Sequence, residues 1–230
     1  KEIYTVRGRP LQRSAKLNDG TLIDVPSEFI PYIQSGDSII KESMLVGSAE
    51  YFMLGALFVI NILISRYYGL GELGSFNFCY AIAQISILGI GSSFSLILRR
   101  DITLYPEKQE SYINQIIRLR FFLLIATIIV LLPAVYAFDQ KDTHLLVFLM
   151  IIFLIKGFDL FSETYYTTYQ SLQLYKRFSI VKSLNAFCSL CIVFICCILR
   201  LPVISLYLSL LAVAIIFFLF NIYYYQKTKN

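Results

Sequence analysis

The sequence predicts an all-α protein that crosses a membrane six times, and three observations support this fold class. Hydrophobic residues make up 57% of the 230 residues and charged residues only 15%, with a mean hydropathy of +0.68, which excludes a soluble globule. Beyond residue 43 the apolar runs are each long enough to cross a bilayer. Lysine and arginine also alternate in abundance between successive loops.

The first 43 residues differ in composition from the rest of the chain, because they hold 12 of its 35 charged residues. We therefore expect a polar cytoplasmic segment over 1–43 and a transmembrane part over 44–230. Turn residues at 18–20 before alternating residues 21–25 predict a β-hairpin, and 36–41 is interpreted as another short strand. The alternative is an unrelated polar tail. Because the chain begins with Lys1 and lacks the apolar core of a signal peptide, we interpret it as a piece of a longer protein.

Six apolar segments follow and are predicted to span the membrane, at residues 44–65, 75–98, 118–138, 145–170, 179–199 and 202–225. Of the 20 Lys and Arg residues, 17 lie in the N-terminal segment, the second and fourth connections and the C-terminus, counted with their flanking residues, and three lie in the other connections. Positive residues near span ends collect on the cytoplasmic side. The pattern therefore predicts that both termini are cytoplasmic.

The first three spans carry polar residues that lipid would not tolerate. Glu50 and Asn61 fall on one face of the first span, and Asn77 and Gln84 on one face of the second. The third span begins with Arg118 and Arg120, for which a role as positive-inside residues is favoured over a cavity role; Arg66 follows the first span.

The fourth span has the strongest polar stripe. Lys156, Asp159 and Glu163 are spaced i, i+3 and i+7, so they share one helix face. Each charge at mid-bilayer costs roughly 2.5 to 3.5 kcal/mol on insertion scales, so this face must meet other helices or water. Two interpretations remain open: an internal Lys156–Asp159 pair with Glu163 near the headgroups, or a polar wall of a central cavity.

The sequence offers no catalytic or metal-binding constellation. His144 is the only histidine, and four of the five cysteines lie in the apolar fifth span, where a thiol behaves as a small hydrophobic group. Neither a P-loop nor a G-x-G-x-x-G motif is present. The net charge of +5 reflects membrane topology, so nucleic-acid binding is excluded and we expect no enzyme.

Three stretches carry a family resemblance. Residues 64–77, with Ser-Arg-Tyr-Tyr-Gly followed by Gly-Ser-Phe, look like the first-loop signature of the polysaccharide and oligosaccharide (Wzx-like) flippases of the multidrug/oligosaccharidyl-lipid/polysaccharide superfamily. Leu88-Gly-Ile-Gly91 with Leu98-Arg99-Arg100 is similar to the second span and its basic exit in that family. The segment from Lys156-Gly-Phe-Asp159 through Tyr169-Gln170 to Lys176-Arg177 looks like the end of its fourth span. The chain departs from the family in length, since these transporters have two six-helix lobes.

The resemblance implies one lobe of a transporter that carries an undecaprenyl-pyrophosphate-linked oligosaccharide across the bacterial cytoplasmic membrane for polysaccharide export by alternating access. The expected partners are the lipid-linked oligosaccharide, membrane lipid, and a second six-helix lobe or partner subunit. No cofactor is expected, apart from a coupling cation, H⁺ or Na⁺. The candidate substrate-binding residues are Lys156, Asp159, Glu163, Glu50, Asn61, Arg66, Asn77, Gln84, Arg118 and Arg120.

Two other functions remain open. One is a cation-coupled exporter of drugs or small solutes from the same superfamily, in which Asp159 and Glu163 would bind the coupling ion. The other is a non-transporting membrane subunit of glycan assembly. The short outer loops argue against that second function, because enzymes of this kind carry their chemistry on long loops.

Overall fold

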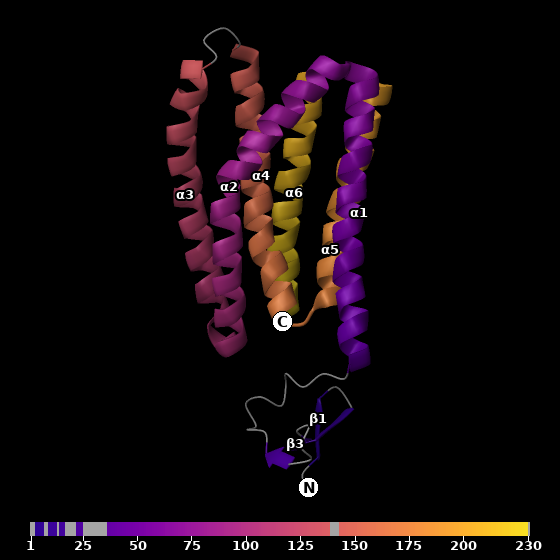
Figure 1. Cartoon of the computed structure of the whole chain (residues 1–230), viewed down its shortest axis with the longest axis vertical. Coiled ribbons are helices and arrows are strands. Elements are labelled where there is room, and N and C mark those ends of the chain that lie inside the picture. Colours follow the sequence, from indigo (N-terminus) through magenta and orange to yellow (C-terminus); the bar gives the residue numbers. More distant parts are fainter. Residues whose placement is uncertain are drawn as a thin grey trace. The chain divides into compact units, whose positions relative to one another are not determined.

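The computed structural model divides the chain into two compact units (Figure 1), Lys1–Met44 and Leu45–Asn230. The residues that the structure describes are 3–6, 9–12, 14–16, 22–24, 36–138 and 143–229.

Two short antiparallel hairpins form in the N-terminal unit. Strand β1 (Ile3–Val6) pairs with β2 (Arg9–Gln12), and β3 (Ser14–Lys16) pairs with β4 (Leu22–Asp24). Strand β4 lies within residues 21–25, which the sequence predicts to be extended, whereas the predicted turn at 18–20 lies outside the described residues.

The strand predicted at residues 36–41 is wrong, because these residues form the start of helix α1, which covers Gly36–Tyr68. Asp37 and Ser38 are residue types favoured at helix N-termini. Ile39 and Ile40 are consecutive, so they do not continue the two-residue alternation of a strand. The segment therefore extends the first apolar helix.

The described part of the second unit consists of six long helices, and only the start of α1 belongs to the first unit. After α1 come α2 (Leu70–Leu104), α3 (Gln109–Phe138), α4 (Thr143–Ser171), α5 (Tyr175–Ile198) and α6 (Val203–Lys229). A short 3₁₀ helix, η2 (Pro106–Lys108), lies between α2 and α3. Each predicted span falls on one helix, inside its limits or within one residue of them. Gly69 separates α1 from α2 with a φ of +94°, a conformation that favours glycine.

The described helices confirm a multi-pass membrane protein. Five of them are long and apolar enough to cross a membrane. Helix α2 is bent by 46° between Leu88 and Ser93, and its two halves make a sixth span if they cross the membrane as one. The fold class predicted from hydropathy is therefore correct at the level of an all-helical bundle of five to six spans.

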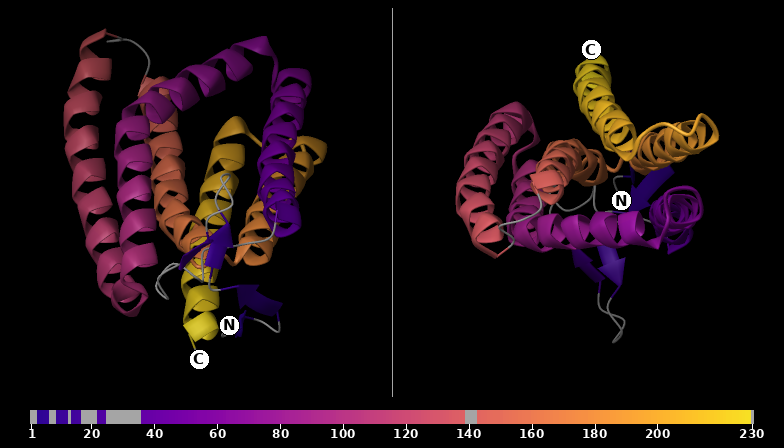
Figure 2. Two further views of the ribbon diagram at one scale, coloured as in Figure 1. Left: turned by 60° about the horizontal axis from the view of Figure 1, so that its bottom comes forward. Right: turned by 90° about the horizontal axis from the view of Figure 1, so that it is seen from above.

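Helix α4 lies at the centre of the bundle, in contact with α2, α3, α5 and α6 (Figure 2). Its neighbours approach closely at two glycines. A Cβ atom on Gly157 would lie 2.7 Å from Leu124 of α3, and one on Gly91 of α2 would lie 3.4 Å from Leu160 of α4. Small residues permit such close approach between membrane helices.

Positive residues gather at one end of the bundle. The α2–α3 connection, the α4–α5 turn and the end of α6 lie at the same end (Figure 1). Exposed or partly exposed cations at this end are Arg99, Arg100, Lys108, Arg118, Lys176, Arg177 and Lys227. Among the described residues, the α1–α2 and α5–α6 connections at the other end carry Arg66 and Arg200. We refer to the end of the bundle that contains the α2–α3 connection, the α4–α5 turn and the end of α6 as the basic end.

Helix α1 joins the bundle through side chains rather than through close backbone contact. Its buried residues are small or aliphatic: Ala49, Ala56, Ile60 and Ile64. Two polar cross-links connect it to α5, an ion pair between Glu50 and Lys182 and a 3.5 Å hydrogen bond from Tyr68 Oη to the Cys196 carbonyl oxygen. Aromatic residues such as Tyr51 and Phe58 point away from the bundle, as expected for a surface in contact with lipid.

The contact between Gly157 and Leu124 predicts a strong size limit at residue 157. Gly157→Leu should lower the melting temperature of the detergent-solubilised protein, because overfilling a tight helix contact costs about 1–3 kcal/mol. Gly55→Leu is the matched control, since a Cβ atom at Gly55 would meet nothing within 4 Å. Equal melting temperatures for the two variants, measured by fluorescence-detected size exclusion, would contradict the close approach.

Candidate functional site

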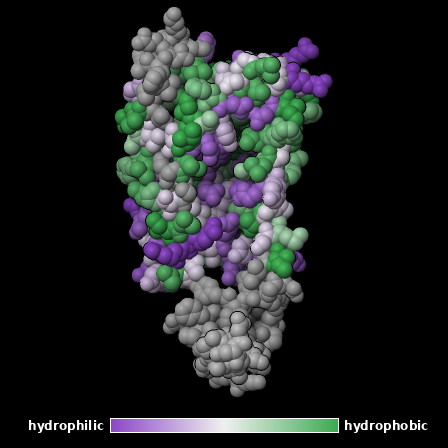
Figure 3. Space-filling view, viewed as in Figure 1, coloured by the Kyte–Doolittle hydropathy of each residue, from purple (hydrophilic) through white to green (hydrophobic). Residues whose placement is uncertain are grey.

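A cavity of about 590 Å³ lies inside the helical bundle. Helices α1, α2, α4, α5 and α6 form its walls, and Figure 3 shows a hollow with hydrophilic side chains on the face between α1 and α2. The lining from α1 and α6 is apolar, whereas α2, α4 and α5 supply the polar residues Tyr80, Gln84, Ser95, Lys156, Asp159, Glu163, Tyr166, Lys182, Asn185 and Ser189.

The polar stripe predicted on the fourth span faces this cavity. Lys156, Asp159 and Glu163 all line it. Lys156 Nζ lies 3.7 Å from Asp159 Oδ2, so the predicted internal pair also forms. The two interpretations left open by the sequence are thus compatible, except that Glu163 lines the cavity instead of lying apart from it near the headgroups.

The Lys156 ammonium is held mainly by an aromatic residue of α2. Its Nζ donates a 2.7 Å hydrogen bond to Tyr80 Oη and lies 3.9 Å from the centre of the Tyr80 ring. The Lys156 side chain is 12% exposed, whereas that of Asp159 is 42% exposed. The carboxylate of this pair is therefore the more accessible partner, and the ammonium is held against the wall.

Glu163 has no hydrogen bond or ion pair with any residue of the described part of the chain. It lies one turn of α4 beyond Asp159, and one turn before Tyr166, whose hydroxyl is buried without a hydrogen-bond partner among the described residues. This part of the cavity therefore presents an acceptor that is available to a ligand.

Lys182 of α5 is a cavity residue that the sequence analysis missed, because it was counted among the positive residues flanking a loop. Its side chain is only 10% exposed, and its Nζ lies 2.5 Å from Glu50 Oε1 of α1. A signal was present: Lys182, Asn185 and Ser189 have the same i, i+3, i+7 spacing as the stripe on α4.

The two candidate arginines of α3 have different environments. Arg118 is exposed and donates a 3.3 Å hydrogen bond to the Asn114 carbonyl oxygen of its own helix. Arg120 is fully buried and does not line the cavity. Its guanidinium donates four hydrogen bonds, at 2.7 to 3.1 Å, to the Leu160 carbonyl oxygen and Thr164 Oγ1 of α4 and the Gly91 carbonyl oxygen and Ser95 Oγ of α2. Arg120 therefore joins three helices, unlike the exposed Arg118, and the cytoplasmic side predicted for both residues stays a prediction.

The remaining candidates are dispersed. Gln84 lines the cavity. Glu50 does not line it, but forms an ion pair with Lys182, which does. Asn61 donates a 3.1 Å hydrogen bond to the Leu57 carbonyl oxygen of its own helix and does not line the cavity. Arg66 and Asn77 are exposed near the α1–α2 connection.

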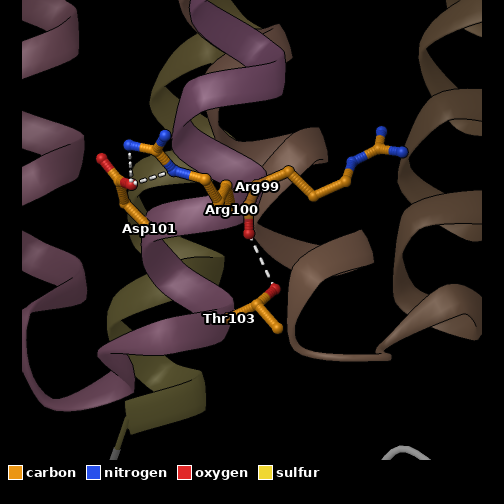
Figure 4. Close-up of polar contacts among 4 residues, drawn as sticks. All are labelled: Arg99, Arg100, Asp101 and Thr103. Carbon is orange, nitrogen blue, oxygen red and sulfur yellow. Dashed lines mark hydrogen bonds and ion pairs between the residues drawn. The ribbon is translucent and has the colours of Figure 1, made fainter.

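The basic end of α2 is held by local contacts (Figure 4). Arg100 forms an ion pair with the neighbouring Asp101, at 2.8 Å, and Thr103 Oγ1 donates to the Arg99 carbonyl oxygen. The Arg99 guanidinium points the other way in Figure 4 and donates to Gln170 Oε1 of α4. These two arginines lie outside the cavity, and Arg99 connects the end of α2 to α4.

No protein-family model matches the sequence, and no significant similarity to a curated protein or to a solved structure is found. The family resemblance therefore stays a prediction from the sequence.

The environments of Arg118 and Arg120 predict that their replacement by alanine affects protein stability to very different extents. Arg120→Ala should greatly lower the yield of folded protein, because it removes four hydrogen bonds that join α3 to α2 and α4, and a hydrogen bond from a charged group contributes about 1.5–3 kcal/mol. Arg118→Ala, on the exposed face of the same helix, should change stability by less than about 0.5 kcal/mol. The monodisperse peak in size exclusion measures both; similar yields would contradict the buried role of Arg120.

Proposed function

We propose that this protein is a membrane transporter that moves a lipid-linked oligosaccharide, carried on undecaprenyl pyrophosphate, across the bacterial cytoplasmic membrane for polysaccharide export. The observation that carries the proposal is a cavity of about 590 Å³, inside an apolar bundle, that contains two lysines and two carboxylates. Charges inside a membrane bundle are expensive, so such residues mark the path of a polar ligand.

The cavity lining suits a headgroup that combines phosphate with sugar. Lys156 and Lys182 supply ammonium groups for phosphate oxygens. Glu163 and Asn185 supply acceptors for sugar hydroxyl groups, and Asn185 supplies a donor. The apolar lining from α1 and α6 suits the lipid end of the same molecule.

A second six-helix lobe or a partner subunit is part of the proposal. The cavity opens on the face between α1 and α2, and the Asp159 side chain is 42% exposed. A charge on a lipid-facing surface costs several kcal/mol, so a polar surface must cover this opening in the working transporter. Alternating access between two lobes then moves the headgroup from one side to the other.

One observation favours a second candidate function, a cation-coupled exporter of drugs or small solutes. Glu163 lines the cavity and forms no ion pair within the described residues. A carboxylate in that position binds H⁺ or Na⁺ readily, and the same coupling cation could drive the flipping of a lipid-linked sugar. Transport of a drug in reconstituted vesicles without any lipid-linked sugar would favour this second function.

We also propose that the basic end faces the cytoplasm, with both termini on that side. After replacement of the five native cysteines, a cysteine at Arg200 should react with an impermeant thiol reagent added to intact cells, whereas one at Lys108 should react only after the membrane is permeabilised. Both positions are exposed, so accessibility from one side is the only variable. The reverse labelling pattern would contradict this orientation.

The role of Lys156 tests the proposed function. In the complete protein, Lys156→Ala should keep a normal protein level and lower glycan export about 10- to 100-fold, as expected for the loss of a charged hydrogen bond of about 1.5–3 kcal/mol. The assay is surface glycan in a bacterial strain that lacks its own flippase for lipid-linked oligosaccharides. Arg66→Ala, a change at an exposed cation outside the cavity, is the matched control.

A purely structural role for Lys156 gives a different result. If Lys156 only neutralises Asp159, then Lys156→Ala should lower the amount of folded protein, and Lys156→Ala with Asp159→Ala should restore both protein and export. Wild-type export by a normally expressed Lys156→Ala protein would remove this residue from the mechanism.

A further inference from the structure

Lys182 is as enclosed as Lys156, the other lysine of the cavity. It lies in α5 near the basic end, its side chain is 10% exposed, and its Nζ lies 5.2 Å from the ring centre of Phe178 and 5.9 Å from that of Tyr166. The one carboxylate within ion-pair distance of it among the described residues is Glu50 of α1. Glu50 is thus its contact ion-pair partner among the described residues, while the carboxylates of Asp159 and Glu163, which line the same cavity, interact with the Lys182 ammonium from a greater distance.

The two partners of this ion pair are not equivalent. Lys182 lines the cavity and is enclosed, whereas Glu50 does not line it and its side chain is 42% exposed. A ligand in the cavity can therefore reach Lys182, whereas Glu50 lies outside the cavity lining. Displacing Glu50 leaves a carboxylate that is already partly exposed, so exchange is less costly than unpairing two buried charges.

The two cavity lysines lie at different depths. Lys182 is near the Tyr166 ring, and Lys156 precedes Tyr166 by ten residues on α4. At 1.5 Å per residue the two ammonium groups are roughly 10 to 15 Å apart along the bundle. Tyr166 also lines the cavity at the level of Lys182, but its hydroxyl oxygen is buried, so the ammonium of Lys182 is the group that this level offers to an anion.

We propose that Lys182 is a second anion-binding residue of the cavity. Its ammonium pairs with Glu50 when the cavity is empty, and it pairs with the pyrophosphate group of the ligand when the ligand binds. Lys182 serves the end of the cavity nearer the basic end, and Lys156 serves the deeper part. This inference rests on the proposed function for its lipid-linked ligand, but the exchange between Glu50 and a pyrophosphate group can be measured without transport.

The test measures binding of inorganic pyrophosphate to the complete protein in nanodiscs by isothermal titration calorimetry. Glu50→Gln removes the competing anion and should tighten binding about tenfold, which corresponds to about 1.4 kcal/mol. Lys182→Met should weaken binding, and Glu50→Gln with Lys182→Met should show no gain. Lys176→Met, a change at an exposed lysine of the same helix, is the control and should bind like the wild type.

A structural role for the ion pair predicts the opposite result for Glu50→Gln, namely weaker or unchanged binding. That outcome overturns the inference, and because it comes from a variant with Lys182 intact, a folding failure of Lys182→Met cannot obscure it. If Lys156→Met still weakens binding in the same experiment, the proposed function stands without Lys182.

A final experiment distinguishes between a lipid headgroup and a soluble anion as the ligand that binds to Lys182. Undecaprenyl pyrophosphate added to the nanodiscs should displace inorganic pyrophosphate, and Glu50→Gln should strengthen this displacement. Binding of the inorganic anion without displacement by the lipid would support the exchange at Lys182 and overturn the lipid-linked ligand of the proposed function. Absence of pyrophosphate binding by the wild type and by Glu50→Gln would overturn the inference itself.

Discussion

Charged side chains inside a lipid-embedded bundle need polar partners, because each one left facing hydrocarbon costs roughly 2.5 to 3.5 kcal/mol on insertion scales. Three largely buried cations lie within the described helices, and each has a polar partner on at least one neighbouring helix. Arg120 joins α3 to α2 and α4, Lys156 joins α4 to α2, and Lys182 joins α5 to α1. The positions of these cations therefore account for much of the way in which the helices are arranged.

The central position of α4 follows from the same constraint. One of its faces carries three charged residues, and its other faces carry buried aromatic, hydroxyl and glycine residues that let α2, α3 and α6 approach. Its carboxylates are less well satisfied than the cations around them. Asp159 is 42% exposed, and Glu163 has no hydrogen bond within the described chain, so both carboxylates of the cavity can accept hydrogen bonds from a ligand.

Helix α1 has a different relation to the bundle. It contributes apolar residues to the cavity wall and is connected to α5 by two polar cross-links, near Glu50 and near Tyr68. Because few close backbone contacts hold it, breaking the Glu50–Lys182 pair would remove much of what fixes that part of α1. In a transporter such a helix is suited to movement when a ligand arrives, whereas the α2–α3–α4 group around Arg120 is suited to remain rigid.

The sequence by itself determined the membrane class, the place of each long helix in the chain, and the shared face of Lys156, Asp159 and Glu163, because hydropathy and the 3.6-residue period depend only on local order. It gave a wrong strand at 36–41, where residues of ambiguous local preference precede a long helix. Only the tertiary structure distinguished Arg120 from Arg118 and placed Lys182 in the cavity. The physical reason is that periodicity tells which residues share a helix face, whereas burial and charge pairing depend on which helix that face meets.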